Sequence, residues 1–567
     1  MKEGLRKGLT SYGDADFSLF LRKAFIKAAG YSDDALDRPI VGVTNTSSDY
    51  NPCHGNVPDL IESVKRGVLL AGALPMVFPT ISIGESFAHP TSMFLRNLMA
   101  MDTEEMIRAQ PMDAVVLIGG CDKTLPAQVM GAASSDLPAI FVPTGPMVVG
   151  HHKGEVLGAC TDCRRLWGQH RAGTIGLVEI ERISGRLAPS VGTCMVMGTA
   201  STMACILEAM GLALPMSATA PATHADRRRI AEASGKRAAE LAIAGTPKPS
   251  ELITDASVRN AMIVLQAIGG STNGLIHLAA IAGRAGVKIN LDAFDRLGRE
   301  VPVLLNLKPS GAHYMEHFHH AGGLPVLMRE LRTLLDLGAP TVSGVALGDA
   351  IANAEVVAGQ DVIGSIADPL KKEGAMAVLH GNLAPNSAVI KQSAASASLM
   401  RHTGRAVVFE SVEDMTTRID LPDLDVHAED ILVLRNAGPK GAPGMPEAGY
   451  LPIPMKLARQ GVKDMVRISD ARMSGTAFGT IVLHVTPEAA IGGPLAIVQT
   501  GDKILLDVEA RRIELLIDEE ELKNRLAAWK QLPPQRAAAI RGYARLFEEC
   551  VLQADQGCDF NFLVPES

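Results

Sequence analysis

Cysteine is scarce in this chain, with eight residues spread over 567 positions. Thiols this sparse argue against a disulfide framework, so the question they raise is metal binding or redox chemistry. Long basic runs are also lacking, and the formal net charge is -8. This charge argues against a nucleic-acid surface and makes small or moderate-sized partners the expectation.

Long apolar runs are missing as well. No uninterrupted hydrophobic run reaches the length of about 20 residues that a membrane-spanning helix needs. The first 20 residues contain basic side chains but lack the apolar stretch and the small-residue cleavage site of a secretory signal. We therefore expect a soluble, cytoplasmic protein.

The first third of the chain shows a regular alternation of patterns. Between about 39 and 146, short apolar runs alternate with segments of helical spacing such as 57–72. Strands that are apolar on both faces and separated by helices predict a parallel sheet covered on two sides. The candidate strands are 39–44, 75–84, 114–120 and 138–146.

The remainder of the chain has two further textures. Residues from about 200 to 370 are rich in Ala and Leu at helical spacing and predict helical cover for the same domain. From about 376, β-branched runs broken by tight turns, at 480–486 and 494–518, predict strands. The predicted fold class is α/β, with a large N-terminal domain at 1–375 and a smaller β-rich, barrel-like domain at 376–567.

Three cysteines lie among Gly, Pro, Asn or small residues, where backbone can approach a cofactor. They are Cys53 in NPCHGN, Cys121 in GGCDKT and Cys194 in VGTCMVMGTAS. Cys121 also follows an apolar run directly, and ligands of parallel sheets gather beyond the carboxyl ends of the strands. Spacing alone does not show that the three share a metal. Cys205 and Cys550 fall in helical patterns, and we expect them in the core.

Two tidier patterns also resemble metal or redox sites. Cys160-Thr-Asp-Cys163 could be half a zinc site or a redox pair, but no second C-x-x-C and no thioredoxin-like context accompany it. His317, His319 and His320 look like ligands, yet neighbouring histidines in a helix or turn point in different directions. We predict that the cysteine pair is incidental and that the histidines line a polar surface or pocket.

Acidic residues suited to Mg²⁺ are present beside these loops. Asp122 stands next to Cys121, Glu85 lies in SIGES, and Glu447 lies in PGMPEAGY. Their carboxylates could supply oxygen to Mg²⁺, although isolated acids are usually solvated. Ser474 lies in DARMSGTAFG after another apolar run, but no G-x-S-x-G elbow marks it as an activated nucleophile.

Eight motifs in this order resemble the dihydroxy-acid and sugar-acid dehydratase family of iron–sulfur enzymes, over essentially the whole chain. They are NPCHGN, SIGES, GGCDKTLPAQVMGA, VGTCMVMGTAS, GGSTN, HGNLAP, PGMPEAGYLPIP and SDARMSGTAFG. The resemblance implies an iron–sulfur cluster, a Mg²⁺ ion and a serine base. The residues it implies are Cys53, Cys121 and Cys194 for the cluster, Glu85, Asp122, carbamylated Lys123 and Glu447 for Mg²⁺, and Ser474 as the base.

The implied reaction removes water from a 2,3-dihydroxycarboxylate and gives a 2-keto-3-deoxy acid. Three thiolates leave one iron a vacancy for the departing C3 hydroxyl, while Mg²⁺ holds the carboxylate and the C2 hydroxyl. Ser474 would remove the C2 proton as an alkoxide, which requires nearby cations because an unperturbed serine is too weak a base. Carbamylation turns the Lys123 cation into an oxygen anion suited to Mg²⁺.

Within the family, segment 82–107 resembles the pentonate and hexonate dehydratases, whereas the branched-chain enzymes tend to carry Gly-His-Glu-Gly-Met there. The resemblance therefore favours a sugar acid (aldonate) substrate, a [2Fe-2S] rather than a [4Fe-4S] cluster, and a homodimer or homotetramer. A dihydroxy-acid dehydratase of branched-chain amino-acid biosynthesis is the alternative. A phosphogluconate enzyme would need a basic clamp, and a solvated helix start explains the triplet 227–229 more simply.

Some residues depart from the family pattern. His54 after Cys53 and the HFHH run at 317–320 mark places where substrate contacts could differ. The chain length and stereochemistry of the acid stay open, as does activity on short acids such as glycerate. Two other classes are alternatives: a metal-binding or regulatory module without catalysis, and a zinc hydrolase built on Cys160, Cys163 and histidines.

Overall fold

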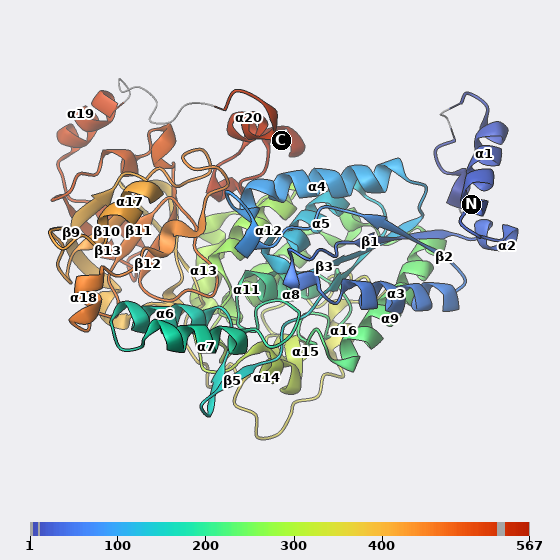
Figure 1. Ribbon diagram of the computed structural model, residues 1–567, viewed down its shortest axis with the longest axis horizontal. Coiled ribbons are helices and arrows are strands. Elements are labelled where there is room, and N and C mark those ends of the chain that lie inside the picture. Colours follow the sequence, from blue (N-terminus) through green and yellow to red (C-terminus); the bar gives the residue numbers. More distant parts are fainter. Residues whose placement is uncertain (1–3, 10–11, 530–538, 566–567) are drawn as a thin grey trace.

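The computed structural model describes residues 4–9, 12–529 and 539–565, and it contains a parallel sheet and a closed barrel (Figure 1). The sheet has the order β2-β1-β3-β4, and all neighbours are parallel. Three of its strands are buried almost throughout, because helices cover both faces. The strands are β1 (Ile40–Asn45), β2 (Leu74–Pro79), β3 (Ala114–Gly119) and β4 (Ala139–Pro143).

Helices cover the sheet in two layers (Figure 1). One layer holds α3 (Val57–Leu70) and α9 (Ala225–Ala244), and the other holds α4 (Ser92–Ala109) and α5 (Cys121–Ser135). The α3 and α9 backbones touch, because a Cβ on Gly67 would overlap the Glu232 carbonyl and one on Gly235 would overlap the Val64 carbonyl. Glycine at these positions permits the close approach of the two helices.

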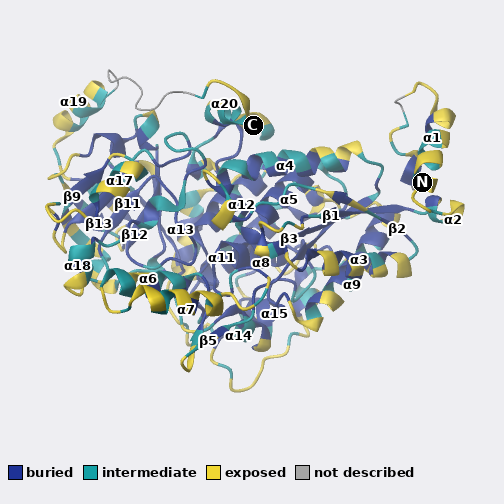
Figure 2. Cartoon of the chain, in the orientation of Figure 1, coloured by how far each residue is buried: buried dark blue, intermediate teal, exposed yellow. Residues whose placement is uncertain are grey.

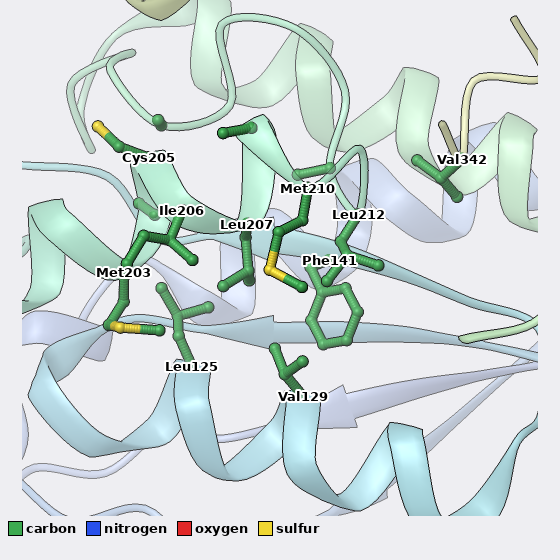
Figure 3. Packing of buried hydrophobic residues seen from close by; sticks show 14 of the residues in the cluster. Leu125, Val129, Phe141, Met203, Cys205, Ile206, Leu207, Met210, Leu212 and Val342 are labelled. Atoms are coloured by element: carbon green, nitrogen blue, oxygen red, sulfur yellow. The ribbon is translucent and has the colours of Figure 1, made fainter. Parts of the chain in front are cut away.

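The central region is helical, as predicted. Helix α8 (Thr199–Ala209) packs on α5 and β4 behind the sheet, and the contact involves Leu125, Val129, Phe141 and Met203 (Figure 3). Cys205 lies in this core, as expected. The elements here are β5 (Gly150–His152), β6 (Glu155–Leu157), α6 (Thr161–Arg171), α7 (Leu177–Leu187), α8 (Thr199–Ala209), α10 (Pro249–Leu252), α11 (Asp255–Ala267), α12 (Thr272–Arg284), α13 (Leu291–Glu300), α14 (Met315–His320), α15 (Gly323–Glu330) and α16 (Leu347–Ile351).

The C-terminal strands close into a barrel of order β10-β11-β12-β8-β7-β14-β13-β9. Neighbours from β9 through β12 run parallel, so their carboxyl ends share one rim. The elements are β7 (Ala377–Gly381), β8 (Ala384–Ile390), β9 (Arg401–Phe409), α17 (Val412–Arg418), β10 (Ile431–Leu434), α18 (Met455–Arg459), β11 (Arg467–Ser469), β12 (Ile481–Thr486), β13 (Lys503–Asp507), β14 (Arg512–Leu515) and α19 (Glu519–Trp529).

One predicted strand is wrong. The run beginning at Pro494 forms a short 3-10 helix, Pro494–Ile497, instead of a strand. Proline lacks an N–H for a sheet and has a backbone angle suited to a first helical position. Arg435 satisfies the carbonyls of Ala496 and Val498 that a sheet would otherwise pair.

The end of the chain returns to the N-terminal region, where α20 (Gly542–Cys550) lies near α4 (Figure 1). The Phe94 and Phe547 rings stand 4.9 Å apart, and Arg284 on α12 forms a fully buried ion pair with Asp559 at 2.6 Å. Burial is concentrated in the sheet, the central helices and the barrel, while outer helices such as α7 and α19 are exposed (Figure 2). These contacts hold the C-terminal segment against α4 and α12.

The predicted fold class, α/β with a parallel sheet followed by a barrel, is confirmed. The division of the chain at 375/376 stays a prediction. Among the helices in the described ranges, none has both the length and the apolar character needed to cross a membrane. Two further helices, α1 (Ala15–Lys27) and α2 (Asp33–Leu36), precede the sheet.

Candidate active site

The predicted site residues meet where the carboxyl edge of the sheet faces the barrel loops. Cys53 follows β1, Glu85 follows β2, and Cys121 begins α5 directly after β3. Glu447 follows β10 and Ser474 follows β11. Because parallel strands end at a common edge, residues far apart in the sequence come together here.

The thiols form two adjoining pairs. The Cys121 thiol hydrogen-bonds to Cys53 and, together with burial, raises the pKa of Cys53 well above its ordinary value. The sulfur of Cys194 lies 3.6 Å from that of Cys160. This contact and burial raise the pKa of Cys194, and the charge of Cys53 adds to the effect. Close, buried thiols ionise together only when a cation compensates their charge, which suits an iron–sulfur cluster.

Cys160 is a thiol that the sequence analysis named but assigned no role. Its side chain faces Cys163 as well as Cys194, and hydrogen bonds from these two thiols lower the pKa of Cys160. The C-x-x-C pair predicted to be incidental therefore lies against a predicted ligand. No spacing in the sequence relates Cys160 to Cys194, because α6 and α7 separate them.

Lys123 occupies an unusual environment for an amine. Its side chain is fully buried, and its Nζ lies 3.4 Å from Glu85 Oε2 and 3.5 Å from Asp122 Oδ2. Within the described part of the chain, this nitrogen has no hydrogen-bond partner. A buried amine without a hydrogen bond is costly, and conversion to a carbamate would replace the amine by oxygens. The residues thus fit a carbamylated lysine.

Three carboxylates surround this lysine. Oxygens of Glu85, Asp122 and Glu447 all lie within 4.8 Å of one another. Carboxylate oxygens are the ligands that Mg²⁺ prefers, and lysine carbamate oxygens would complete a set of hard donors. The predicted ligands are therefore placed together, and their donor type fits Mg²⁺.

Arg472 is a site residue that sequence reasoning did not single out. Its fully buried guanidinium donates to Glu447 at 2.6 Å and to Glu85 at 3.1 Å. Burial acts to raise the pKa of Glu85, but Arg472 and Lys123 outweigh it and hold that pKa well below its usual value. Burial raises the pKa of Glu447 despite the same arginine. The position of Arg472 within the SDARMSGTAFG motif was the sequence signal that could have identified it.

Ser474 is held in a tightly packed turn. Its Oγ lies 2.9 Å from Thr476 Oγ1. The backbone on either side is anchored, because Asn273 donates to the Met473 carbonyl and Lys391 donates to the Gly475 carbonyl. Over the described ranges, no carboxylate or imidazole hydrogen-bonds to Ser474 Oγ. A cation would therefore have to supply its activation as a base.

His54 is enclosed by protein atoms. Its side chain is fully buried, and its Nε2 accepts the Gly120 N–H at 2.8 Å while its Nδ1 lies 2.8 Å from the Thr46 carbonyl. Burial lowers the pKa of His54 and favours the neutral ring that this pattern needs. The expectation that His54 marks a substrate contact is wrong, because the ring braces the turn before Cys121.

The histidines at 319 and 320 and the triplet 227–229, to which the sequence analysis gave no role in the site, differ in burial. His320 is exposed, as predicted for a polar surface, but His319 is buried. In the triplet 227–229, α9 begins at Ala225 as expected for a helix start, yet Arg227 is fully buried. It donates to the carbonyls of Pro143 and Ser217 and cannot clamp a phosphate.

Comparison with known proteins finds one enzyme family over most of the chain. The family described as "Dihydroxy-acid/6-phosphogluconate dehydratase N-terminal" matches residues 38–350, and its C-terminal counterpart matches residues 361–558. An L-arabonate dehydratase of Azospirillum brasilense is 47% identical over 98% of this chain and 96% of its own. A 6-deoxy-6-sulfo-D-gluconate dehydratase of Pseudomonas putida is 45% identical over 94% and 91%. A dihydroxy-acid dehydratase of Moorella thermoacetica is 38% identical over 92% and 95%.

Proposed function

The chain belongs to the dihydroxy-acid/6-phosphogluconate dehydratase family, and from this we propose that it is a hydro-lyase acting on a sugar acid. The substrate would be an aldonate with 2,3-hydroxyls, and the product a 2-keto-3-deoxy acid. Support comes from the relatives named for sugar acids, which are 47% and 45% identical, against 38% for the dihydroxy-acid dehydratase. The observation that carries the proposal is the meeting of thiols, carboxylates and Ser474 at one edge.

The residues present would hold the two cofactors of the family. Cys53, Cys121 and Cys194 would hold the cluster, which we infer to be [2Fe-2S]. The Mg²⁺ ligands would be Glu85, Asp122, Glu447 and carbamylated Lys123. When bound, these groups supply Lewis acidity toward the substrate hydroxyls and carboxylate.

The chain itself would orient the substrate and move protons. Arg472 fixes Glu85 and Glu447 through its guanidinium. Ser474 Oγ would accept the C2 proton, and Thr476 holds that oxygen at 2.9 Å. The C3 hydroxyl leaves as water after it gains a proton, and the resulting enol tautomerises to the ketone. The burial of Ser474 limits access of bulk water to the reacting carbon.

Replacement of Ser474 by Ala tests the proposed base. Turnover should fall by about 10²- to 10⁴-fold, the usual contribution of a general base, while visible absorption, iron and labile sulfide stay unchanged. Ser469→Ala is a matched control, since Ser469 is buried on β11 and its Oγ accepts the Ala471 N–H within the same turn. Unchanged turnover in Ser474→Ala would remove the serine from the mechanism and favour a binding module. A colourless protein with zinc and no sulfide would favour the hydrolase alternative.

A substrate panel separates the two branches of the family. Steady-state kcat/KM should be highest on pentonates or hexonates, and rates on glycerate show how far short acids are accepted. A higher kcat/KM on a branched 2,3-dihydroxy acid would overturn the sugar-acid assignment and support the biosynthetic alternative. We further propose a homodimer or homotetramer in the cytoplasm, where a reducing environment keeps thiols available for a cluster.

A further inference from the structure

A second group of metal-ligand side chains lies away from the active-site loops. His224 immediately precedes α9, Asp226 is in the first turn of that helix, and His319 comes from α14. One nitrogen of each histidine and one oxygen of Asp226 lie within 4.8 Å of one another. This grouping is independent of the proposed dehydratase chemistry.

The distances suit a single small cation. Asp226 Oδ2 lies 2.9 Å from His224 Nδ1 and 3.3 Å from His319 Nε2. In a tetrahedral zinc site with bonds of about 2.0 to 2.1 Å, neighbouring ligand atoms stand roughly 3.3 to 3.4 Å apart. Asp226 Oδ2 therefore already lies near this spacing from both imidazoles, and the two imidazole nitrogens lie within 4.8 Å of each other.

The buried histidine also has the partner expected of a metal ligand. His319 Nδ1 lies 3.2 Å from Thr219 Oγ1, so the ring is oriented with its other nitrogen toward Asp226. Outer hydrogen bonds of this kind fix the tautomer and direction of metal-bound histidines.

A neighbouring side-chain cation already pairs with the Asp226 carboxylate. Arg229 forms an ion pair with Asp226, but its side chain is 70% exposed and can turn into solvent. Exposed ion pairs contribute little free energy, so displacement of Arg229 would cost little. The neighbouring His320 ring stands 5.6 Å from that of His319.

We propose that His224, Asp226 and His319 form a binding site for a transition-metal dication such as Zn²⁺, with water in the fourth position. Two imidazoles and one carboxylate favour Zn²⁺, Co²⁺ or Ni²⁺ over Mg²⁺. The site therefore differs in chemistry from the all-oxygen set around Lys123. It would join α14 to the start of α9.

The location gives such a metal a structural consequence. The Met315 N–H at the start of α14 donates to the Met195 carbonyl at 2.8 Å, one residue after Cys194. A metal that fixes α14 would therefore steady the segment that carries a proposed cluster ligand. Bound zinc is expected to raise the melting temperature, because a ligand that binds only the folded state stabilises it.

Zinc titration of the intact holoprotein tests the site. Protein with full iron and sulfide content is exposed to Zn²⁺, passed through a desalting column and analysed for both metals. Wild type should retain one additional zinc per chain, with iron unchanged and a raised melting temperature. His319→Gln and Asp226→Asn should weaken zinc binding by at least about tenfold. His317→Gln is the matched control, because His317 lies on the same helix outside the trio.

Three results would overturn the site. They are equal zinc uptake by wild type and both ligand variants, equal loss of zinc in His317→Gln, and uptake only in exchange for iron. The last result would mark binding at the thiols. In His319→Gln the glutamine still offers Thr219 a hydrogen-bond partner. Asp226→Asn is a second, independent variant. The iron content of each variant shows whether it has folded. The proposed function fails separately, through missing iron or missing turnover, whatever the zinc result.

Discussion

At the scale of single residues, two charged side chains of the active-site loops are buried in surroundings that are unusual for such groups. Lys123 is buried among carboxylates yet makes no hydrogen bond in the described structure, and Arg472 is buried between two acids. Burying charges of this kind costs free energy, and such groups are found most often at sites of binding or catalysis. Lys123 as a carbamate and Arg472 as an anchor for Glu85 and Glu447 account for both arrangements.

Lys123→Met should remove the proposed carbamate and so weaken the proposed Mg²⁺ binding. Loss of one oxygen ligand from a hard site is expected to reduce Mg²⁺ affinity and turnover by about 10²-fold or more. The measurement is activity as a function of Mg²⁺, with carbon-13 NMR after growth on labelled bicarbonate to detect the carbamate carbon. Lys153→Met, at an exposed lysine, serves as the control. A wild-type Mg²⁺ profile in Lys123→Met would contradict the carbamate.

Lys391 predicts a pH dependence of stability. Burial lowers the pKa of Lys391 from 10.5 to about 7, and no carboxylate pairs with it among the described residues. The unfolded chain therefore holds more protons between those pH values, so the free energy of unfolding rises with pH across that window. Below about pH 7 the buried charge destabilises the fold fully.

Lys391→Met should remove this penalty. Unfolding by denaturant should show the variant more stable than wild type by roughly 3 kcal/mol below pH 7. The pKa shift of Lys391 from 10.5 to about 7 corresponds to roughly 5 kcal/mol, and the lost hydrogen bond of the charged amine offsets about 2 kcal/mol of this. The rise of stability between about pH 7 and 10.5 should flatten in the variant. Lys236→Met, at an exposed lysine, should keep the wild-type slope. An unchanged slope in Lys391→Met would contradict the buried charge.

At the scale of elements, strand ends and helix starts position the chemistry. The turn from β3 into α5 is so tight that Cys121 adopts a φ of 53°, in the left-handed region that a side chain rarely occupies. Such a conformation costs on the order of 1 kcal/mol or more and persists only where neighbours enforce it. His54 is one of these neighbours through its bond to Gly120. The N-terminus of α5 also directs its positive dipole end toward Cys121 and Asp122.

The turn that carries Ser474 predicts a sensitive glycine. A Cβ on Gly475 would stand 2.5 Å from Ser271 Cβ and 2.9 Å from the Thr199 nitrogen, so the turn must shift. Gly475→Ala should lower kcat by about 10²-fold, because a displacement near 1 Å at a catalytic group costs that much. Gly185→Ala on α7 meets no atom and should be neutral. Iron content and kcat of both variants decide the matter, and a normal kcat in Gly475→Ala would show that the turn adapts.

At the scale of the whole molecule, the site depends on two units meeting. The sheet edge supplies Cys53, Cys121, Glu85 and Asp122, and the loop before α8 supplies Cys194. The barrel rim supplies Glu447, Arg472 and Ser474. The C-terminal segment returns to the helices beside the sheet and adds the buried pair of Arg284 and Asp559. Neither unit alone contains the complete set of proposed ligands.

The N-terminal helix predicts how copies of the chain associate. Helix α1 stands apart from the body (Figure 1), and Phe20 and Phe25 on it are 65% and 77% exposed. Exposed aromatic groups of this kind mark interaction surfaces, and we expect a second copy to cover them. Phe20→Ser with Phe25→Ser should lower the oligomeric state or weaken association at least tenfold in sedimentation. Phe562→Ser, at another exposed ring, is the control, and unchanged association in the double variant would place the interface elsewhere.

Much of this protein was determined by its sequence alone. Hydrophobic runs and helical spacing predicted the parallel sheet, its helical cover and the C-terminal strands, because local periodicity decides which faces are buried. The positions of Glu85 and Asp122 after candidate strands favoured a shared edge, since parallel strands end together. That Cys53 and Cys121 join one site was implied by the family resemblance. The ordered motifs implied the family before any coordinates.

Only the tertiary structure decided the contacts between segments distant in the chain. It placed Cys160 against Cys194, Arg472 between two carboxylates, and His224 and Asp226 beside His319. It also removed His54 from the substrate and replaced the strand at Pro494 with a 3-10 helix. Such contacts depend on how helices and loops cross in space, and no local periodicity carries that information.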